Sequence, residues 1–307
     1  MEYNFNELKT RVEKLKKEQN AVILAHYYVP DDVQALADYI GDSYGLAKLA
    51  TQVDADEIIF CGVDFMGQSA KILNPTRRVF LPSAQASCPM AHMITADAIK
   101  EMRSRYDDLT VVCYVNSTAE IKALSDVCVT SSNALKIVKK LPGKNIFFIP
   151  DGNLGHYIKE QCPEKNVIPW KGYCLVHAAI TIHDVEKARI AHPQAKLLAH
   201  PECPADILNE ADYIGSTKGI IDAARTMPDQ GFIIATECGV LCELHRQCPG
   251  KTFYTVHPNQ ICVNMKRVTA DKVLDALVNH SNEVFVPEDI AAAALKPLQR
   301  MIELAES

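Results

Sequence analysis

The chain has 307 residues, of which 48% are hydrophobic and 23% are charged, a composition typical of a folded globular protein with an ample core. This composition excludes a disordered chain, a collagen and a coiled coil. The 32 basic and 38 acidic residues give a formal net charge of −6, so no general attraction to nucleic acid or to an anionic membrane is expected. At about 150 residues per domain, the length allows one to three domains.

The sequence contains no apolar run of the ~18 residues that a membrane-spanning helix needs. Its first residues lack both the basic and the apolar segment of a signal peptide. We therefore expect a cytoplasmic protein. The eleven cysteines are an unusual number, and in a reducing compartment we do not expect them to form disulfides. Most would then be small buried hydrophobic residues, and a few could be metal ligands.

The predicted elements alternate between helices and strands along the whole chain. A charged amphipathic helix is predicted at 6–20, with Asn6 as its N-cap, and a last helix at 287–306, interrupted at Pro297. Between them, short apolar runs alternate with helical patterns, which is typical of parallel α/β proteins. The predicted strands are 22–28, 38–41, 57–63, 79–81, 111–115, 127–130, 146–150, 167–170, 197–200, 212–215, 232–236 and 252–256.

These predicted strands repeat with a period of about 86 to 88 residues. The pentapeptide Ala-Asp-Tyr-Ile-Gly occurs at 37–41 and again at 211–215, two periods later. We therefore predict an α/β fold of three pseudo-symmetric α/β/α domains, each with a small parallel sheet. Their predicted ranges are 20–104, 105–190 and 191–278, and the segments 1–19 and 279–307 are predicted to be terminal helices packed on this body.

Polar, ionisable or thiol side chains occupy equivalent positions of the three repeats, mostly after strands, where parallel sheets bind ligands. The four sets are His26, Tyr114 and His200; Tyr28, Asn116 and Glu202; Ser43, Ser131 and Thr217; and Cys88, Cys174 and Cys262. Each set alone could be structural, because Ser and Thr are common helix caps. Together, in one register, they predict a single site where three domains meet. The hydroxyl set precedes predicted helices, which favours bound phosphate or carboxylate.

The set of three cysteines suits a metal centre, since each repeat supplies one thiol. Zinc would need a fourth ligand such as His177 or His257, and the close cysteine pairs of a zinc ribbon are absent. A [4Fe–4S] cluster with three cysteine ligands has one iron that is free to act as a Lewis acid. A rival set with the spacing C-x3-C-x5-C is formed by Cys238, Cys242 and Cys248. The cysteines expected in the core are Cys61, Cys113, Cys128 and Cys162.

An ordered series of motifs between residues 20 and 275 resembles the quinolinate synthase family. The motifs are AHYY at 25–28, GDSYGLA at 41–47, SCPMA at 87–91, YVNS at 114–117, TSSNA at 130–134, GYCLVH at 172–177, HPECP at 200–204, GST at 215–217 and CVNMK at 262–266. The resemblance implies condensation of iminosuccinate (iminoaspartate) with dihydroxyacetone phosphate to quinolinate, phosphate and two waters in NAD biosynthesis. It also implies three domains around a central [4Fe–4S] cluster with Cys88, Cys174 and Cys262 as ligands.

By the same resemblance, the substrate-binding residues would be His26, Ser43, Tyr114, Asn116, Ser131, His200, Glu202 and Thr217. Glu202 is the expected acid/base residue, and Tyr28 and His200 are its expected partners. Iminosuccinate would come from an L-aspartate oxidase or dehydrogenase, and a homodimer is one assembly to consider. Some family members carry further cysteines three and six residues before the last ligand, where this chain has Asn259 and Val256. A redox-switching disulfide there is therefore not expected.

Two other function classes stay open from the residues alone. An aconitase-like iron–sulfur hydro-lyase would use the same open iron on a small carboxylate, without dihydroxyacetone phosphate. A non-enzymatic iron–sulfur sensor would show no turnover, and it would give the ionisable and hydroxyl sets no purpose.

Overall fold

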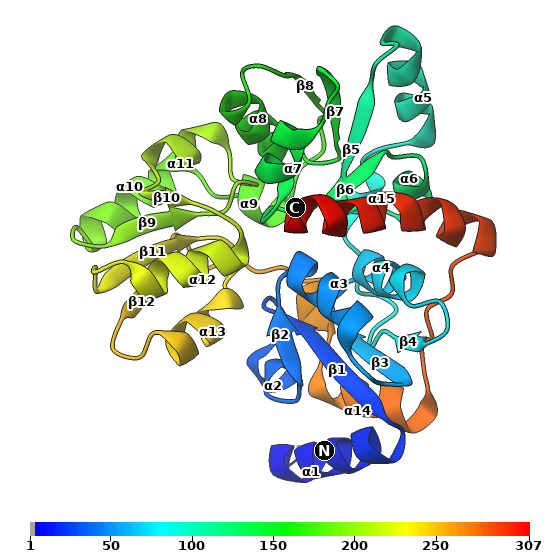
Figure 1. Cartoon of the computed structure of the whole chain (residues 1–307). Coiled ribbons are helices and arrows are strands. Elements are labelled where there is room, and N and C mark those ends of the chain that lie inside the picture. The colour runs from blue at the N-terminus through cyan, green and yellow to red at the C-terminus, as the bar shows by residue number, and fades with distance from the viewer. Residues whose placement is uncertain (1–3) are drawn as a thin grey trace.

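The computed structural model describes residues 4–307, so residues 1–3 of the predicted segment 1–19 lie outside the described residues. Figure 1 shows three α/β units, each a four-stranded sheet with flanking helices. The first unit comprises α1 (Phe5–Glu18), β1 (Ala21–His26), α2 (Asp31–Gln34), β2 (Tyr39–Gly41), α3 (Ser43–Gln52), β3 (Glu57–Cys61), α4 (Asp64–Leu73) and β4 (Arg78–Phe80).

The other two units repeat this order of elements. The second comprises α5 (Ala96–Arg105), β5 (Thr110–Tyr114), α6 (Ala119–Ala123), β6 (Val127–Val129), α7 (Ala134–Lys140), β7 (Asn145–Ile149), α8 (Gly152–Gln161) and β8 (Asn166–Pro169). The third comprises α10 (Ile182–Ala191), β9 (Lys196–Ala199), α11 (Ala205–Glu210), β10 (Tyr213–Ile214), α12 (Thr217–Thr226), β11 (Gly231–Ala235), α13 (Val240–Gln247) and β12 (Thr252–Thr255).

All three sheets are parallel and have the same strand order, β2-β1-β3-β4, β6-β5-β7-β8 and β10-β9-β11-β12. The two central strands of each sheet are almost entirely buried, because helices cover both faces, and this explains their continuous apolar sequences. The predicted α/β class with three small parallel sheets is confirmed.

An equivalent ion pair fastens the leading helix of each unit to its sheet. In each unit, a basic side chain of that helix forms an ion pair with the aspartate directly before the second strand. The pairs are Lys16–Asp38 at 2.7 Å, Arg103–Asp126 at 3.0 Å and Arg189–Asp212 at 3.4 Å. Each aspartate also accepts a backbone N–H from the first strand, at 2.7–2.8 Å. The domain boundaries after residues 104, 190 and 278 stay a prediction.

Three connectors, 81–95, 170–181 and 256–269, lead out of the last strand of each sheet. They carry η1 (Pro89–His92), α9 (Leu175–Ala178) and η2 (Met265–Arg267). The third connector leads to α14 (Ala270–Asn279), which returns to the first unit and packs beside α1. The Gln19 side chain fixes this contact by donating Nε2–H to the carbonyl of Leu277 at 2.8 Å.

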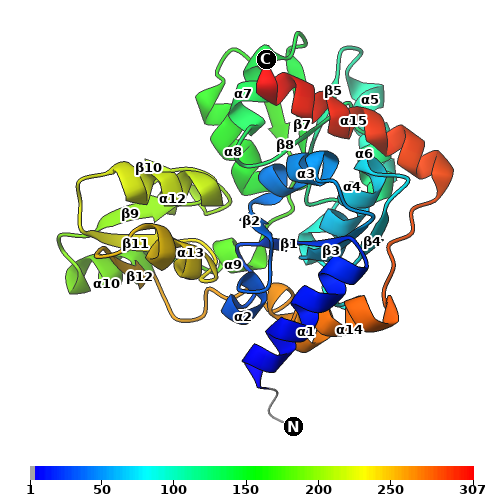
Figure 2. The ribbon, with the colours of Figure 1, turned by 60° about the horizontal axis from the view of Figure 1, so that its bottom comes forward.

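The last helix, α15 (Glu288–Glu306), lies across the second unit and also touches α4 of the first, as Figures 1 and 2 show. It continues through Pro297, so the predicted interruption is wrong. Pro297 is itself buried, so the packing of α15 against the core keeps the helix continuous despite the missing N–H of the proline. The predicted cap of α1 is also wrong, because Asn4 is the N-cap and accepts the backbone N–H of Asn6 at 3.2 Å.

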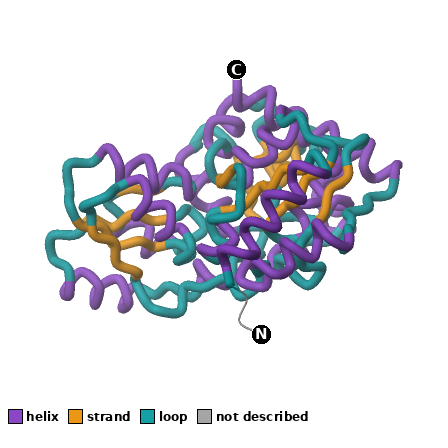
Figure 3. Tube along the Cα trace, turned by 90° about the horizontal axis from the view of Figure 1, so that it is seen from below, coloured by secondary structure: helices purple, strands orange, loops and turns teal. Residues whose placement is uncertain are grey.

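The apolar core is shared unequally among the units. One large cluster of buried side chains joins the first and second units with α14 and α15. The third unit has two smaller clusters, one containing Leu197 and Ile233 and the other containing Leu198 and Phe232, and the latter also includes Tyr27 of the first unit. Figure 3 accordingly shows the third unit as a separate lobe on the left. Within residues 4–307, no helix combines the length and apolarity needed to cross a bilayer.

Candidate active site

A cavity of about 300 Å³ lies where the carboxyl ends of the central strands from the three sheets converge. All twelve residues of the four sets line it, namely His26, Tyr28, Ser43, Cys88, Tyr114, Asn116, Ser131, Cys174, His200, Glu202, Thr217 and Cys262. The structure thus brings every sequence-predicted site residue to one place. Their individual roles stay a prediction.

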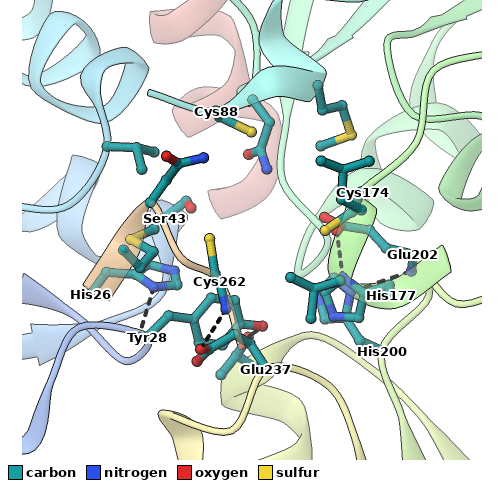
Figure 4. Close-up of a pocket in the computed structure, with 18 of the residues that line it drawn as sticks. His26, Tyr28, Ser43, Cys88, Cys174, His177, His200, Glu202, Glu237 and Cys262 are labelled. Atoms are coloured by element: carbon teal, nitrogen blue, oxygen red, sulfur yellow. Dashed lines mark hydrogen bonds and ion pairs between the residues drawn. The ribbon is translucent and has the colours of Figure 1, made fainter. Parts of the chain in front are cut away.

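The three cysteines enter this cavity from the three connectors, and Figure 4 shows Cys88, Cys174 and Cys262 around its centre. Each is followed by a short helical turn, whose N–H groups point back to the sulfur. Burial raises the pKa of each thiol, to about 12 for Cys88, while the N–H three residues later lowers it in part. These backbone N–H groups belong to Ala91, His177 and Met265. Such N–H contacts to sulfur are typical of iron–sulfur ligands.

The spacing of the three thiols distinguishes a cluster from a single ion. All eleven cysteines are free thiols. The sulfur atoms of Cys88, Cys174 and Cys262 do not all lie within 4.8 Å of one another. Three thiolates on one tetrahedral zinc ion would be about 3.8 Å apart, given a Zn–S distance of about 2.3 Å. The donor set therefore fits a cluster of several irons better than one zinc ion.

Two histidines at strand ends share one local geometry. His26 ends β1 and its Nδ1 accepts the backbone N–H of Tyr28 at 3.2 Å. His200 follows β9 and its Nδ1 accepts the N–H of Glu202 at 3.3 Å. In each case the remaining proton of the neutral ring is therefore on Nε2. Burial lowers the pKa of both histidines to about 3, so they are neutral hydrogen-bond donors at pH 7.

Glu202 is the central carboxylate of the site and is only 3% exposed. The Tyr114 hydroxyl donates to its Oε1, and Nδ1 of His177 lies 2.9 Å from its Oε2. Burial alone would raise the pKa of Glu202, but His177, His200 and the Tyr114 hydrogen bond lower it. Burial and the charge of Glu202 raise the pKa of Tyr114. The pair is therefore a carboxylate and a protonated phenol.

A chain of short contacts connects Glu202 to Tyr28. The Tyr28 hydroxyl lies 2.7 Å from Oγ1 of Thr217 and 2.8 Å from Oγ1 of Thr236. Thr236 in turn lies 2.9 Å from Nε2 of His177. Burial raises the pKa of Tyr28, so its hydroxyl keeps its proton. The chain joins groups from the first and third units and the second connector.

The residues of the hydroxyl set, Ser43, Ser131 and Thr217, are not the N-caps of the helices near them. Asp42 caps α3 by accepting the N–H of Gly45 at 2.8 Å, so Ser43, its first residue, can face the cavity. Ser216 likewise caps α12, which begins with Thr217. Ser131 lies three residues before α7, so its predicted place at the start of the helix is only approximate.

Three further residues of this arrangement were not recognised from the sequence. Glu237 lines the cavity, and Thr236 and Asp151 are buried beside it. Glu237 is 1% exposed, and its Oε1 accepts the N–H of Cys262 and contacts Nζ of Lys266, both at 3.0 Å. Asp151 is also buried and caps α8. Asp151 and Glu237 each come two residues after the third strand of their sheet, 86 residues apart. The same repeat arithmetic would therefore have found them.

None of the three rival cysteines lines the cavity. Cys238 and Cys242 are part-exposed, and Cys248 is buried. Among residues 4–307, the one group of three close metal-ligating atoms comes from Cys174, His177 and Glu202, within 4.8 Å of one another. His257 is not part of it. The four cysteines predicted for the core are buried, as expected.

Comparison with known proteins gives the class that this fold and site define. The chain matches the family described as Quinolinate synthetase A protein over residues 10–303. It is 52% identical to the quinolinate synthase of Fusobacterium nucleatum, over 97% of this chain and 99% of that protein. The quinolinate synthase of Caldicellulosiruptor bescii is 48% identical over 98% and 99%, and that of Methanoregula boonei 45% over 97% and 98%. These relatives are named as enzymes, and the class defined here is therefore an enzyme whose three α/β units surround one cavity.

The chain belongs to the quinolinate synthase family. Members of this family depend on an iron–sulfur centre.

Proposed function

We propose that this protein condenses iminosuccinate with dihydroxyacetone phosphate to form quinolinate, phosphate and two waters for NAD biosynthesis. The observation that carries the proposal is that residues at twelve equivalent positions of three repeats line one cavity. Membership of the quinolinate synthase family supports it. The proposal includes an L-aspartate oxidase or dehydrogenase as the source of iminosuccinate, a cytoplasmic location and a homodimer.

Cys88, Cys174 and Cys262 would hold a [4Fe–4S] cluster, one thiolate from each connector. When bound, the cluster supplies an iron with an open coordination position, a Lewis acid that lowers the cost of expelling hydroxide. The N–H groups that point at the three sulfurs favour their thiolate forms.

The binding residues supply neutral donors to substrates that are both anionic. His26 and His200 offer Nε2–H groups, and the hydroxyl set offers O–H groups. The Tyr114 hydroxyl already donates to Glu202, so its oxygen remains as an acceptor for substrate. Asn116 adds an amide whose Oδ1 is buried without a hydrogen-bond partner among the described residues. A buried polar atom without a partner is costly, so a substrate donor would relieve it. The proposed binding set is His26, Ser43, Tyr114, Asn116, Ser131, His200, Glu202 and Thr217.

Proton transfers fall to Glu202, Tyr28 and His200. Glu202 is kept as a carboxylate and can accept a proton, whereas Tyr28 keeps its proton and can donate it. The contacts through Thr236 and His177 hold the two groups in fixed relative positions. Orientation of this kind is what general acid–base catalysis requires.

The proposal is tested by an anaerobic assay of the cluster-loaded protein with both substrates. We expect quinolinate and inorganic phosphate in equal amounts, and neither product when dihydroxyacetone phosphate is omitted. Turnover of a carboxylate without dihydroxyacetone phosphate would instead indicate the aconitase-like hydro-lyase. Absence of any turnover in a protein with full iron and sulfide content would favour the third function class, a non-enzymatic iron–sulfur sensor.

Replacing Glu202 with Gln tests the acid–base role. We expect kcat to fall by about 100-fold or more, because the amide cannot accept the proton. Iron and sulfide content should stay at the wild-type level, since Glu202 is not among the proposed cluster ligands. The matched control is Glu210→Gln, an exposed position of the same unit, which should keep full activity. Near-normal turnover in a cluster-replete Glu202→Gln protein would remove Glu202 from the mechanism.

A further inference from the structure

Three side chains at one edge of the cavity are arranged as a mononuclear metal site. Cys174 and His177 lie on one helical turn, as Cys-x-x-His at the start of α9, and Glu202 approaches from the loop after β9. Their sulfur, nitrogen and oxygen atoms all lie within 4.8 Å of one another. His177 is 2% exposed and Glu202 3%. Thiolate, imidazole and carboxylate are the three ligand types that zinc takes in proteins.

The atoms around this group leave one ligand atom free on each side chain. Nε2 of His177 contacts Oγ1 of Thr236 at 2.9 Å, which leaves Nδ1 to face the group. Nδ1 lies 2.9 Å from Oε2 of Glu202 and has no hydrogen-bond partner of good geometry among the described residues. The Tyr114 hydroxyl occupies the other oxygen, Oε1. Bonds of this kind to the far side of His and carboxylate ligands are what orients them in zinc sites.

We propose that, in the cluster-free protein, Cys174, His177 and Glu202 bind one zinc ion, with water as the fourth ligand. Zinc takes the place between Nδ1 and Oε2, and the Cys174 thiol releases its proton to solvent as the Zn–S bond forms. No electron transfer is involved. Donors on one tetrahedral zinc are about 3.3 to 3.8 Å apart. Nδ1 and Oε2, now 2.9 Å apart, therefore need to separate slightly, and the Cys174 sulfur lies within 4.8 Å of both.

Zinc and the cluster exclude each other, because both need the sulfur of Cys174. This inference goes beyond the proposed function and does not depend on it. The zinc site uses neither Cys88 nor Cys262, and it needs no catalytic turnover.

The test titrates the full-length, cluster-free chain with zinc under anaerobic conditions, against a chromophoric chelator. We expect one tightly bound zinc per chain. Cys174→Ala and His177→Ala should each raise the Kd by about 100-fold or more, since each removes a ligand. Thr236→Val should raise it about 10-fold through loss of the outer contact. The matched controls Cys88→Ala and Cys262→Ala should keep the wild-type Kd, although both lose the cluster.

Cobalt provides a second readout that does not depend on affinity. The wild-type chain and Cys88→Ala should show a thiolate-to-cobalt charge-transfer band, and Cys174→Ala should not. Circular dichroism and urea unfolding of each variant establish that it is folded. The zinc-loaded wild-type chain should also fail to take up iron and sulfide until zinc is chelated.

Three results would overturn the inference. These are the absence of stoichiometric zinc binding, its loss in Cys88→Ala or Cys262→Ala, and its persistence in both Cys174→Ala and His177→Ala. The quinolinate assay is independent of all three. A chain that makes quinolinate but binds no zinc refutes only the zinc site, and a chain that binds zinc as described but makes no quinolinate refutes only the proposed function.

Discussion

Glu237 shows how a single buried carboxylate can hold the site together. Its Oε1 meets both the N–H of Cys262 and the ammonium of Lys266, and Lys266 also donates to the carbonyl of Tyr28 at 2.6 Å. Its Oε2 accepts the N–H of Gly239 at 2.6 Å. One side chain of the third unit thereby fixes the third connector and reaches the first unit.

Replacing Glu237 with Gln should therefore lower the free energy of unfolding of the cluster-free chain by about 2 kcal/mol. The reason is that the part-buried ammonium of Lys266 loses its charged partner and keeps only the carbonyl of Tyr28. Urea unfolding with an unchanged m value would measure this. Glu186→Gln is the control: this exposed glutamate contacts only His183, at 3.8 Å, and should change stability by about 0.5 kcal/mol or less. Equal stabilities of the two variants would contradict the anchoring role.

At the residue scale, the sequence could predict which residues meet but not how they pair. Equal spacing placed His26, Tyr114 and His200 at one cavity, because parallel strands of like register end at the same edge. It could not place His177 between Glu202 and Thr236, because that contact joins side chains from the second connector and the third unit. Contacts between side chains of different units do not recur at a fixed spacing in the sequence, so the repeat cannot predict them.

At the scale of elements, α15 is the part that the repeat does not explain. It has no counterpart in the other two units, and it packs on α6, β6 and α4. The prediction of an interruption at Pro297 was wrong because tertiary packing of α15 outweighs the local cost of the proline, and that packing is not visible in the sequence. The central strands of each sheet were predictable because they are short buried apolar runs. The contact of α14 with α1 was not, because nothing local in either helix specifies its partner.

Truncation of Leu298 tests the contribution of α15. Leu298 is fully buried between the first two units, so Leu298→Ala should lower the free energy of unfolding by about 3 kcal/mol. Lys296→Ala, two residues earlier and exposed, should change it by about 0.5 kcal/mol or less. A loss below about 1 kcal/mol at Leu298 would mean that α15 is peripheral to the core.

At the scale of the whole molecule, the proposed cluster ligands lie in the connectors and not in the sheets. Each connector leaves one sheet and leads to a helix that packs elsewhere: α5 pairs with Asp126, α10 with Asp212, and α14 with α1. The first two units share one large core, whereas the third has two smaller clusters, one of which includes Tyr27 of the first unit. A cluster held by the three proposed ligands would therefore add a further link between the third unit and the other two.

Removal of the cluster should accordingly lower the Tm of the wild-type chain by about 5 °C, because a group that binds only the folded state stabilises it. Differential scanning calorimetry under anaerobic conditions would measure the shift. Cys262→Ser in its cluster-free form should melt close to the cluster-free wild type, since only the ligand is lost. If the cluster-loaded and the cluster-free chains had the same Tm, the bound cluster would not stabilise the folded protein through the connectors.

The equivalent ion pairs of the three leading helices bear on how the protein arose. A helix, a four-stranded sheet and a cysteine connector form one unit of about 86 to 88 residues, and three copies close around the cavity. An ancestor with one such unit could have built this cavity only as a cyclic trimer, with three identical residues at every equivalent position. Three repeats within one chain do not have that restriction. The position of Tyr28 in the first unit is occupied by Asn116 in the second and by Glu202 in the third, so one cavity presents a phenol, an amide and a carboxylate at equivalent places, which suits a ligand without threefold symmetry.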